Sequence, residues 1–321
     1  MSTARAAGLA LGFAADRAFG DPARWHPVSG FGRAGRGLER RMYAPSRLRG
    51  AAFAGILVAG PAGLGLAAGR ACRGRPVAEA VTVALATWTV LGGTTLAREA
   101  RAVETRLARG DLTAARARVT RLVGRDSETM AAADVARAAI ESVAENTSDA
   151  VVAPLFWGAL LGPAGLLGYR AVNTLDAMVG HRSVRYERFG WASARLDDAA
   201  NLAPARLTAL LAALCGADPA GALRAWRRDA RRHPSPNAGP VEAAFAGALG
   251  VRLGGVNAYR GVVEDRGTLG DGRTPEAADI GRTERLAARV GAAALGVSAL
   301  GVSALGVSAL GVSALGGLTP P

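Results

Sequence analysis

Three acidic residues in this chain of 321 residues are spaced four apart, and that spacing could bind a metal ion. Glu141, Glu145 and Asp149 would share one face of a helix, where like charges repel each other. Mg²⁺, which binds one or two carboxylates together with substrate phosphates, would relieve that repulsion. A solvated acidic face explains the spacing equally well, so spacing alone does not decide.

A second group of polar residues follows an apolar segment. Asn173 and Asp176 lie one helical turn apart, and Arg170 precedes Asn173 by three residues. Polar groups at an apolar boundary are costly and often functional. A lone histidine such as His181 is usually structural. Its Asn, Asp and Arg neighbours make a catalytic role more plausible than it would be for an isolated histidine. The acidic pair Asp197 and Asp198 comes shortly afterwards.

Two loops rich in Gly and Pro form the remaining candidates. The first is Gly20-Asp21-Pro22, followed by His26; the second is His233-Pro-Ser-Pro-Asn237, followed by Glu242 and Gly254-Gly255-Val256-Asn257. Such loops are typical of turns, but Gly and Asn also let a backbone approach a phosphate. The sequence contains no Walker phosphate loop, no dinucleotide-binding G-x-G-x-x-G after a strand and no G-x-S-x-G elbow.

The elements that carry these residues are separated by long uncharged segments. No charged residue occurs at 50–69, 80–97, 150–169 or in the 32 residues after Arg289, and 202–217 contains only Arg206. A helix that crosses ~30 Å of hydrocarbon needs about 20 apolar residues. Buried helices of a soluble protein rich in Ala and Gly could look similar. We nevertheless predict an all-α, polytopic integral membrane protein with polar helical segments at the membrane surface.

The charge distribution argues against nucleic acid as a partner. The net charge is +13, and all 39 basic residues are Arg. They cluster at the ends of the apolar segments, as in membrane proteins, and no nucleic-acid-binding motif accompanies them. Cys72 and Cys215 fit neither a metal site nor a disulfide framework.

The segments between the predicted spans have their own patterns. We expect a helix at 6–20, a basic loop at 21–49, polar helices at 98–149 and turns at 218–285. Asp111 is expected to cap one helix, and Asp126 or Ser127 the next. The unit Ala294-Leu-Gly-Val-Ser298 occurs four times in succession. We interpret it as a repeat expansion in a terminal membrane helix.

Five ordered motifs give the chain a family resemblance. They are Gly20-Asp-Pro22 with His26-Pro-Val28, Glu141-Ser-Val-Ala-Glu-Asn-Thr-Ser-Asp149, Tyr169-Arg-Ala-Val-Asn-Thr-Leu-Asp176, Phe189-Gly-Trp-Ala192 with Asp197-Asp198, and His233-Pro-Ser-Pro-Asn237. In this order they resemble the CobD family of cobalamin biosynthesis, also called CbiB. The resemblance implies a CobD/CbiB-like membrane domain at 1–285 and an apolar C-terminal segment at 286–321.

The resemblance also implies a reaction. The family joins adenosylcobyric acid, a corrinoid, to (R)-1-amino-2-propanol phosphate in an ATP-dependent amide ligation, and some relatives use ethanolamine phosphate. The expected partners are therefore the corrinoid, the amino-alcohol phosphate, membrane lipid and other membrane-associated enzymes of the pathway, without nucleic acid. ATP as a substrate and Mg²⁺ are expected. The acyl phosphate formed from ATP would be attacked by the amine.

Residue roles follow from fitting the motifs to that chemistry. Glu141, Glu145 and Asp149 are expected to bind Mg²⁺. Proton transfer and catalysis are expected from four residues, which are His181, Asp176, Asp197 and Asp198. Substrate binding is expected from nine residues, which are Asp21, His26, Asn146, Arg170, Asn173, Arg182, Asn201, His233 and Asn237.

Topology constrains the third apolar segment. The Arg-rich region that ends at Arg49 favours the cytoplasm, and two spans would return 98–149 to that side. A third full span would place Asn173 and Asp198 outside, away from ATP. We therefore predict that 150–169 is broken or re-entrant and that the active face of this multi-pass cell-membrane protein is cytoplasmic.

Two other classes of function compete with the enzyme. A membrane regulator like AmpE would need the helices but not the acidic motifs. A corrinoid transporter would be expected to show internal repeats with paired broken helices, and the sequence shows no such duplication.

Overall fold

Helices dominate the structure, which confirms the predicted all-α class. The computed structural model describes residues 3–21, 26–181, 183–259 and 262–315. It divides into two compact units, which we describe separately. Unit 1 comprises Met1–Leu91, Ala153–Ala200 and Ala294–Pro321, and unit 2 comprises Gly92–Val152 and Asn201–Ala293.

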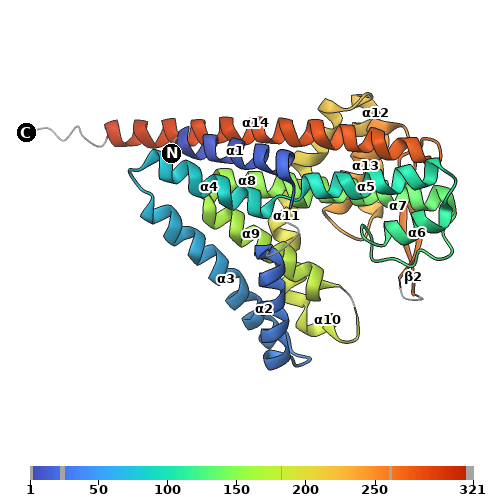
Figure 1. Cartoon of the computed structure of the whole chain (residues 1–321), viewed down its shortest axis with the longest axis horizontal. Helices are drawn as coiled ribbons and strands as arrows, with labels where there is room; N and C mark the ends of the chain where they lie inside the picture. The colour runs from blue at the N-terminus through green and yellow to red at the C-terminus, as the bar shows by residue number, and fades with distance from the viewer. Residues whose placement is uncertain (1–2, 22–25, 182, 260–261, 316–321) are drawn as a thin grey trace, which may run out of the picture. The chain divides into compact units, whose positions relative to one another are not determined.

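Unit 1 contains a series of helical elements, most of which are labelled in Figure 1. They are α1 (Thr3–Phe19), α2 (Pro27–Met42), α3 (Arg47–Ala71), α4 (Pro76–Val90), α8 (Ala153–Leu161), α9 (Pro163–Leu175), the π-helical turn η2 (Asp176–Gly180) and α10 (Tyr186–Phe189). Unit 1 also takes the first part of α11 (Trp191–Cys215) and the end of α14 (Ala277–Leu315). The basic loop predicted at 21–49 is wrong, because α2 and the start of α3 occupy most of it. Pro27 suits the first helical turn, where its missing N–H is not needed.

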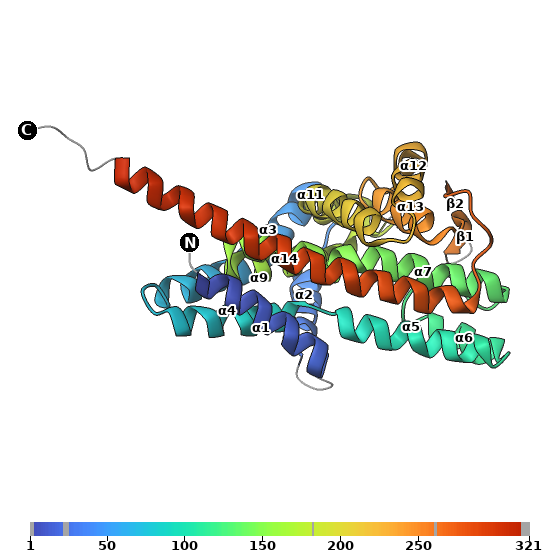
Figure 2. The ribbon, with the colours of Figure 1, turned by 90° about the horizontal axis from the view of Figure 1, so that it is seen from above.

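Helix α1 lies beside α4, as Figures 1 and 2 both show. Gly8 and Gly12 stand one turn apart on α1 and face Val83 and Thr87 of α4. A Cβ atom at either glycine would lie 2.5–2.6 Å from the Cβ of its partner, closer than real atoms approach. Small residues at this spacing allow close packing of helices in membranes.

The core of unit 1 lies where α3 meets α10 and η2. The Phe53 and Phe189 rings pack with their centroids 5.0 Å apart, and Leu175 and Val179 complete the cluster. All four side chains are fully buried. This cluster fixes the chain that leaves α9 and carries His181.

The segment predicted to be broken at 150–169 is divided into two short helices. Gly162, with φ of +61°, ends α8, and Pro163 starts α9. Residues eight apart along a straight helix are about 12 Å apart. The Leu166 side chain nevertheless contacts Gly158: a Cβ atom added to Gly158 would lie within 3.0 Å of it. Helices α8 and α9 therefore fold back on each other. Only glycine adopts such a positive φ readily.

Three helical segments are long and apolar enough to cross a membrane among the described residues. They are Arg47–Ala71, Pro76–Ala108 and Ala277–Val302. The first two contain the spans predicted at 50–69 and 80–97, although Leu91 and Gly92 interrupt the second between α4 and α5. The third contains the first repeats. The segment at 202–217 forms the end of α11 and is not among the three.

Unit 2 is built around α7 (Ala132–Thr147). Its other elements are α5 (Gly93–Ala108), α6 (Leu112–Val119), the π-helical turn η1 (Ser148–Val152), α12 (Pro219–Asp229), the 3₁₀ turn η3 (Ala230–Arg232), α13 (Ala238–Leu249), β1 (Leu253–Tyr259) and β2 (Val262–Leu269). The end of α11 and the start of α14 complete it. The antiparallel hairpin β1–β2 was not predicted, because the Gly-rich segment at 250–272 was interpreted as turns.

The helix starts predicted for 98–149 were partly correct. Asp111 caps α6, where its side chain accepts the Ala114 N–H at 2.9 Å, as predicted. Asp126 or Ser127 as the next cap is wrong, because α7 begins at Ala132 and the Asp134 side chain accepts the Ala131 N–H instead. Helix α14 runs through the predicted domain boundary at residue 285 without a break.

The fold-back at Gly162 depends on close packing at Gly165. A Cβ at this position would collide with the Trp157 carbonyl of α8. We expect Gly165→Ala to lower the free energy of unfolding by about 1–3 kcal/mol, the usual penalty for overpacking. Thermal unfolding in detergent, followed by circular dichroism, measures this. Gly63→Ala in α3, where an added Cβ meets nothing within 4 Å, is the matched control, and equal behaviour of the two variants would contradict the fold-back.

Candidate functional site

A buried salt bridge between Arg125 and Glu141 lies at the centre of unit 2. Arg125 Nη2 is 2.6 Å from Glu141 Oε2, and the two side chains are 4% and 2% exposed. Glu141 Oε1 accepts the Gly254 N–H at 2.7 Å and lies 3.7 Å from the Arg137 guanidinium. Both carboxylate oxygens of Glu141 are therefore engaged by the protein itself.

The same arginines attach the hairpin to α7. Asn257 Oδ1 accepts hydrogen bonds from Arg125 at 2.7 Å and from Arg137 at 3.2 Å, and Arg137 also donates to the Gly254 carbonyl. Gly254 and Gly255 have φ of +77° and +84°, next to an irregularity in the strand register. The Gly-Gly-Val-Asn motif thus positions β1 on α7.

The metal site predicted at Glu141, Glu145 and Asp149 does not fit this geometry. Helix α7 ends at Thr147, and Asp149 lies in the π-helical turn η1, where the four-residue spacing no longer keeps one face. Glu141 is already neutralised by arginine. Within the described ranges, no three His, Cys, Asp or Glu side chains lie close enough to hold a metal ion.

Glu145 belongs to a different group, which also contains Glu242 of α13 and His233. Burial, together with the nearby carboxylates of Glu141 and Glu145, raises the pKa of Glu242 well above its usual value. Burial also raises the pKa of Glu145, although Arg266 and Arg125 oppose it. Burial and the charge of Arg266 lower the pKa of His233 to about 4. At neutral pH the imidazole is therefore uncharged.

In unit 1 the first motif meets the third. His26 Nδ1 accepts the Val28 N–H at 3.2 Å and so caps α2, while His26 Nε2 lies 3.9 Å from Asp21 Oδ1. Burial lowers the pKa of His26, the charge of Asp21 raises it, and the charge of Arg170 from α9 lowers it further. Asp21, His26 and Arg170 are thus neighbours, and their predicted role in substrate binding stays a prediction.

Helix α9 also meets the acidic pair of α11. Asn173 Nδ2 lies 3.5 Å from Asp197 Oδ1. Asp198 lies 3.5 Å from Arg195, and partial burial raises the pKa of its carboxyl. The motifs around Asn173 and Asp197 therefore converge in unit 1, although 24 residues separate them.

His181 and Asp176 lie just beyond α9. Asp176 opens the π-helical turn η2, and such turns are frequent at functional sites. The exposed His181 ring packs edge-on against Tyr186, with centroids 5.0 Å apart. Tyr186 in turn donates to the buried Glu39 at 2.8 Å. Arg182, predicted to bind phosphate, lies outside the described residues.

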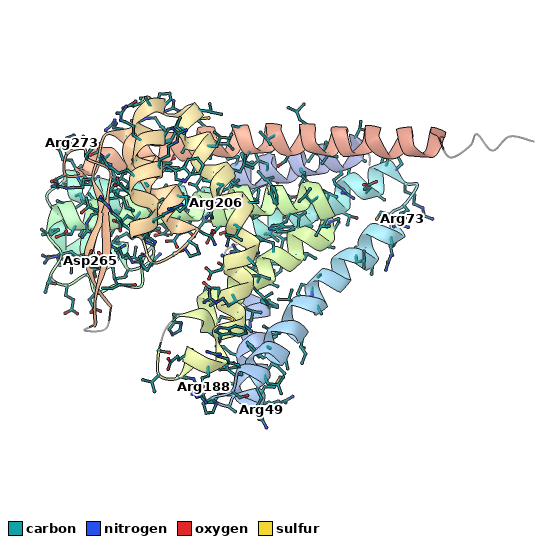
Figure 3. The ribbon with its side chains drawn as sticks, turned by 180° about the vertical axis from the view of Figure 1, so that it is seen from behind. Arg49, Arg73, Arg188, Arg206, Asp265 and Arg273 are labelled. Carbon is teal, nitrogen blue, oxygen red and sulfur yellow. The ribbon has the colours of Figure 1, made fainter. Side chains whose placement is uncertain are left out.

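The amide residues of unit 2 have partners within the protein. Asn146 donates to the Ser142 carbonyl at 2.9 Å. Asn237 accepts from Arg206 at 2.7 Å, and Figure 3 labels Arg206 on the α11 ribbon. Asn201 is buried. The contacts of Asn146 and Asn237 give these two residues a structural function, and the predicted role of all three in substrate binding stays a prediction.

Several residues that organise these groups were missed from the sequence. They are Arg125, Arg137 and Arg266 in unit 2 and Glu39, Arg185 and Tyr186 in unit 1. None belongs to a recognisable motif, since each acts on a residue distant in sequence. Glu242 and Asn257 were noted in the sequence because they follow the fourth motif closely, and this proximity is the signal that could have pointed to their role.

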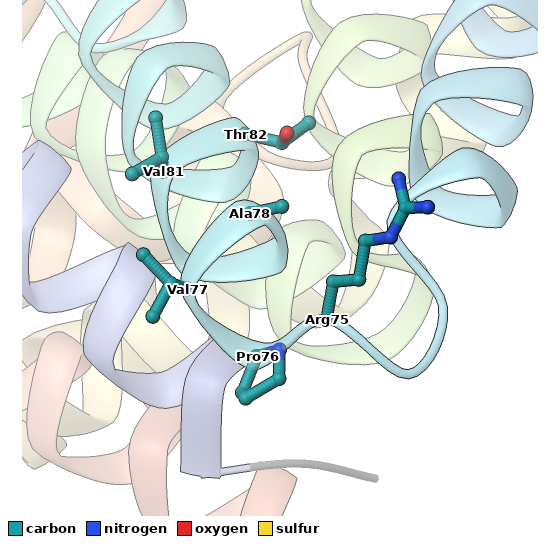
Figure 4. Close-up of a pocket in the computed structure, with 6 residues that line it drawn as sticks. All are labelled: Arg75, Pro76, Val77, Ala78, Val81 and Thr82. Carbon is teal, nitrogen blue, oxygen red and sulfur yellow. The ribbon is translucent and has the colours of Figure 1, made fainter.

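An open apolar pocket lies at the start of α4, and none of its lining residues is a candidate site residue (Figure 4). Its lining combines the Arg75 side chain with Pro76, Val77, Ala78, Val81 and Thr82. Val77 and Val81 are exposed on a helix apolar enough to cross a membrane. The pocket therefore fits contact with lipid chains better than catalysis.

Comparison with known proteins gives the family. The model of the CobD/Cbib protein family matches residues 9–287. This chain belongs to that family. A Mycobacterium tuberculosis protein named cobalamin biosynthesis protein CobD is 53% identical over 296 residues, covering 90% of this chain and 93% of that protein. Relatives of the same name from Chromobacterium violaceum and Geobacter metallireducens are 48% and 47% identical and cover 88% and 81% of this chain. No solved structure matches.

The buried salt bridge of this CobD-family chain gives a direct test of the corrected role of Glu141. We expect Glu141→Gln to destabilise the protein by about 3–5 kcal/mol, because it removes the carboxylate that neutralises buried Arg125. Thermal unfolding in detergent measures this, with Glu128→Gln on the exposed surface as a control that should change stability by less than about 0.5 kcal/mol. Unchanged stability together with weakened Mg²⁺ dependence of activity would restore the metal role.

Proposed function

We propose that this protein joins adenosylcobyric acid to (R)-1-amino-2-propanol phosphate in an ATP-dependent amide ligation that yields adenosylcobinamide phosphate. A role in cobalamin biosynthesis follows from membership of the CobD/Cbib family over most of the chain. Relatives up to 53% identical are named cobalamin biosynthesis protein CobD. The family match is the observation that carries the proposal, and it disfavours the AmpE-like regulator.

The residues of unit 1 suit the phosphate chemistry of this reaction. A carboxylate is a poor electrophile, so the corrin propionate needs activation by ATP. Stabilising the charge on a transferred phosphoryl group requires cations and positioned donors. Arg170, beside His26, and Asn173, beside Asp197, could supply them.

Mg²⁺ would enter this chemistry with the phosphates of ATP. Magnesium sites commonly use only one or two protein carboxylates and complete the shell with phosphate oxygens and water. The adjacent Asp197 and Asp198 fit that requirement better than the acidic triplet of α7, because Glu141 is bonded to arginine. Bound Mg²⁺ would neutralise phosphate charge.

Ligation activity can be measured directly with the purified protein in lipid or detergent. Adenosylcobyric acid, ATP, Mg²⁺ and aminopropanol phosphate are expected to give a corrinoid whose mass increases by the amine minus water, with one ADP per product. Omitting ATP is the control and should abolish the mass increase. Absence of product with either aminopropanol phosphate or ethanolamine phosphate would refute the ligase proposal.

The three apolar helical segments indicate a membrane protein, and we propose a multi-pass topology with a cytoplasmic active face. Ser183→Cys, in a background without Cys72 and Cys215, should resist a membrane-impermeant thiol reagent in intact cells and react after permeabilisation. Arg73→Cys, in the exposed link between α3 and α4 (Figure 3), is the matched control expected to react from outside. Labelling of Ser183→Cys in intact cells would overturn this topology.

A further inference from the structure

Glu242 is a buried carboxyl group without a hydrogen-bond partner in the part of the chain that the structure describes. Its side chain is 1% exposed on the second turn of α13, and neither carboxylate oxygen has a partner among the described residues. Leaving a buried polar group unpaired costs about 1–3 kcal/mol, and more when it is charged. Glu141 in the same unit is equally buried, but arginines and a backbone N–H bind both of its oxygens. Among the described residues, the fold therefore supplies hydrogen-bond partners for the Glu141 carboxylate but none for that of Glu242.

His233 faces Glu242 with a defined tautomer. His233 Nδ1 accepts the Ser235 N–H at 3.0 Å and lies 3.4 Å from the Ser235 carbonyl, and the shorter contact favours the tautomer with its proton on Nε2. Nε2 lies 3.9 Å from Glu242 Oε1, beyond hydrogen-bonding distance, and has no partner among the described residues either. An N–H group is thus directed at an open carboxylate across a gap too long for a direct bond.

The surroundings of Glu242 make it a stronger base than an ordinary carboxylate. Glu141 and Glu145 from α7 add negative charge, and Arg125 and Arg266 oppose them from the segment before α7 and from β2. With burial, the carboxylates prevail, and the pKa of Glu242 rises well above its usual value. A carboxyl group in such a place is ionised most easily when a compact cation binds beside it.

We propose that Glu242, beside the uncharged imidazole of His233, receives the ammonium group of the amino-alcohol phosphate and takes its proton. This rests on the proposed ligase function. The N–H bond breaks, its proton forms an O–H bond on Glu242, and the nitrogen keeps the electron pair. That pair forms the C–N bond to the activated carboxyl carbon, the C–O bond to phosphate breaks, and phosphate carries away the second nitrogen proton. The Glu242 proton then passes to water.

The kinetic test uses Glu242→Gln in the full-length protein. We expect kcat/KM for the amine to fall about 10²- to 10⁴-fold at pH 7, the usual contribution of a general base, with an unchanged KM for adenosylcobyric acid. The deficit should shrink as pH rises, because free amine then needs no base. Glu276→Gln, whose side chain is 72% exposed, is the control expected to match the wild type.

Stability gives an independent readout that a purely structural role would not produce. Because the described residues offer Glu242 no hydrogen-bond partner, Glu242→Leu should raise the thermal unfolding temperature while removing activity, whereas replacing a structural glutamate would lower it. Wild-type ligation with an unaffected Glu242→Gln variant, or with a deficit that does not depend on pH, would overturn this role alone. A higher Mg²⁺ requirement with unchanged amine kinetics would also overturn it. Failure of the wild type to ligate would instead refute the proposed function.

Discussion

A carboxylate removed from water must be matched by positive charge and hydrogen-bond donors, or it must lose its charge. This constraint organises unit 2. Glu141 meets it through Arg125, Arg137 and the Gly254 N–H, and these contacts hold the hairpin on α7. Asp229 meets it through Arg228, Arg232 and the Gly270 N–H. The Glu242 carboxyl group has no such hydrogen-bond donor among the described residues, and this is why we propose it as a base.

The apolar helices obey the corresponding constraint for the backbone. In hydrocarbon each backbone N–H and C=O needs a partner, so irregular backbone is tolerated only where protein or water covers it. The turn at Gly162 lies between two helices that pack on each other, and Arg5 approaches it from α1. The π-helical turn η1, in unit 2, lies at the end of the acidic motif. The π-helical turn η2, in unit 1, lies at the end of the Asn173 motif. Both π-helical turns therefore lie at the ends of motifs for which a chemical role is predicted.

Both groups of candidate residues combine one histidine with acids and arginines, but their histidines differ. His26 is part of a helix cap and faces Asp21, so it is suited to orienting polar groups near Arg170. His233 is fixed by Ser235 as a neutral donor beside Glu242. The proposed amide ligation needs residues that bind phosphate and a residue that takes the amine proton. We propose the group around His26 and Arg170 for the first role and Glu242 for the second.

The sequence by itself determined the helical class, the apolar segments at 50–69 and 80–97, the cap at Asp111 and the family. These features depend on local composition, on spacing along one helix or on ordered motifs, and all three can be read directly from the amino-acid sequence. Only the tertiary structure decided which acid is neutralised and which stays open. Glu141 and Glu242 look alike in sequence, and their difference depends on Arg125, on Gly254 and on the unpredicted hairpin. The energy of a buried charge is set by neighbours distant in the chain, which periodicity cannot reveal.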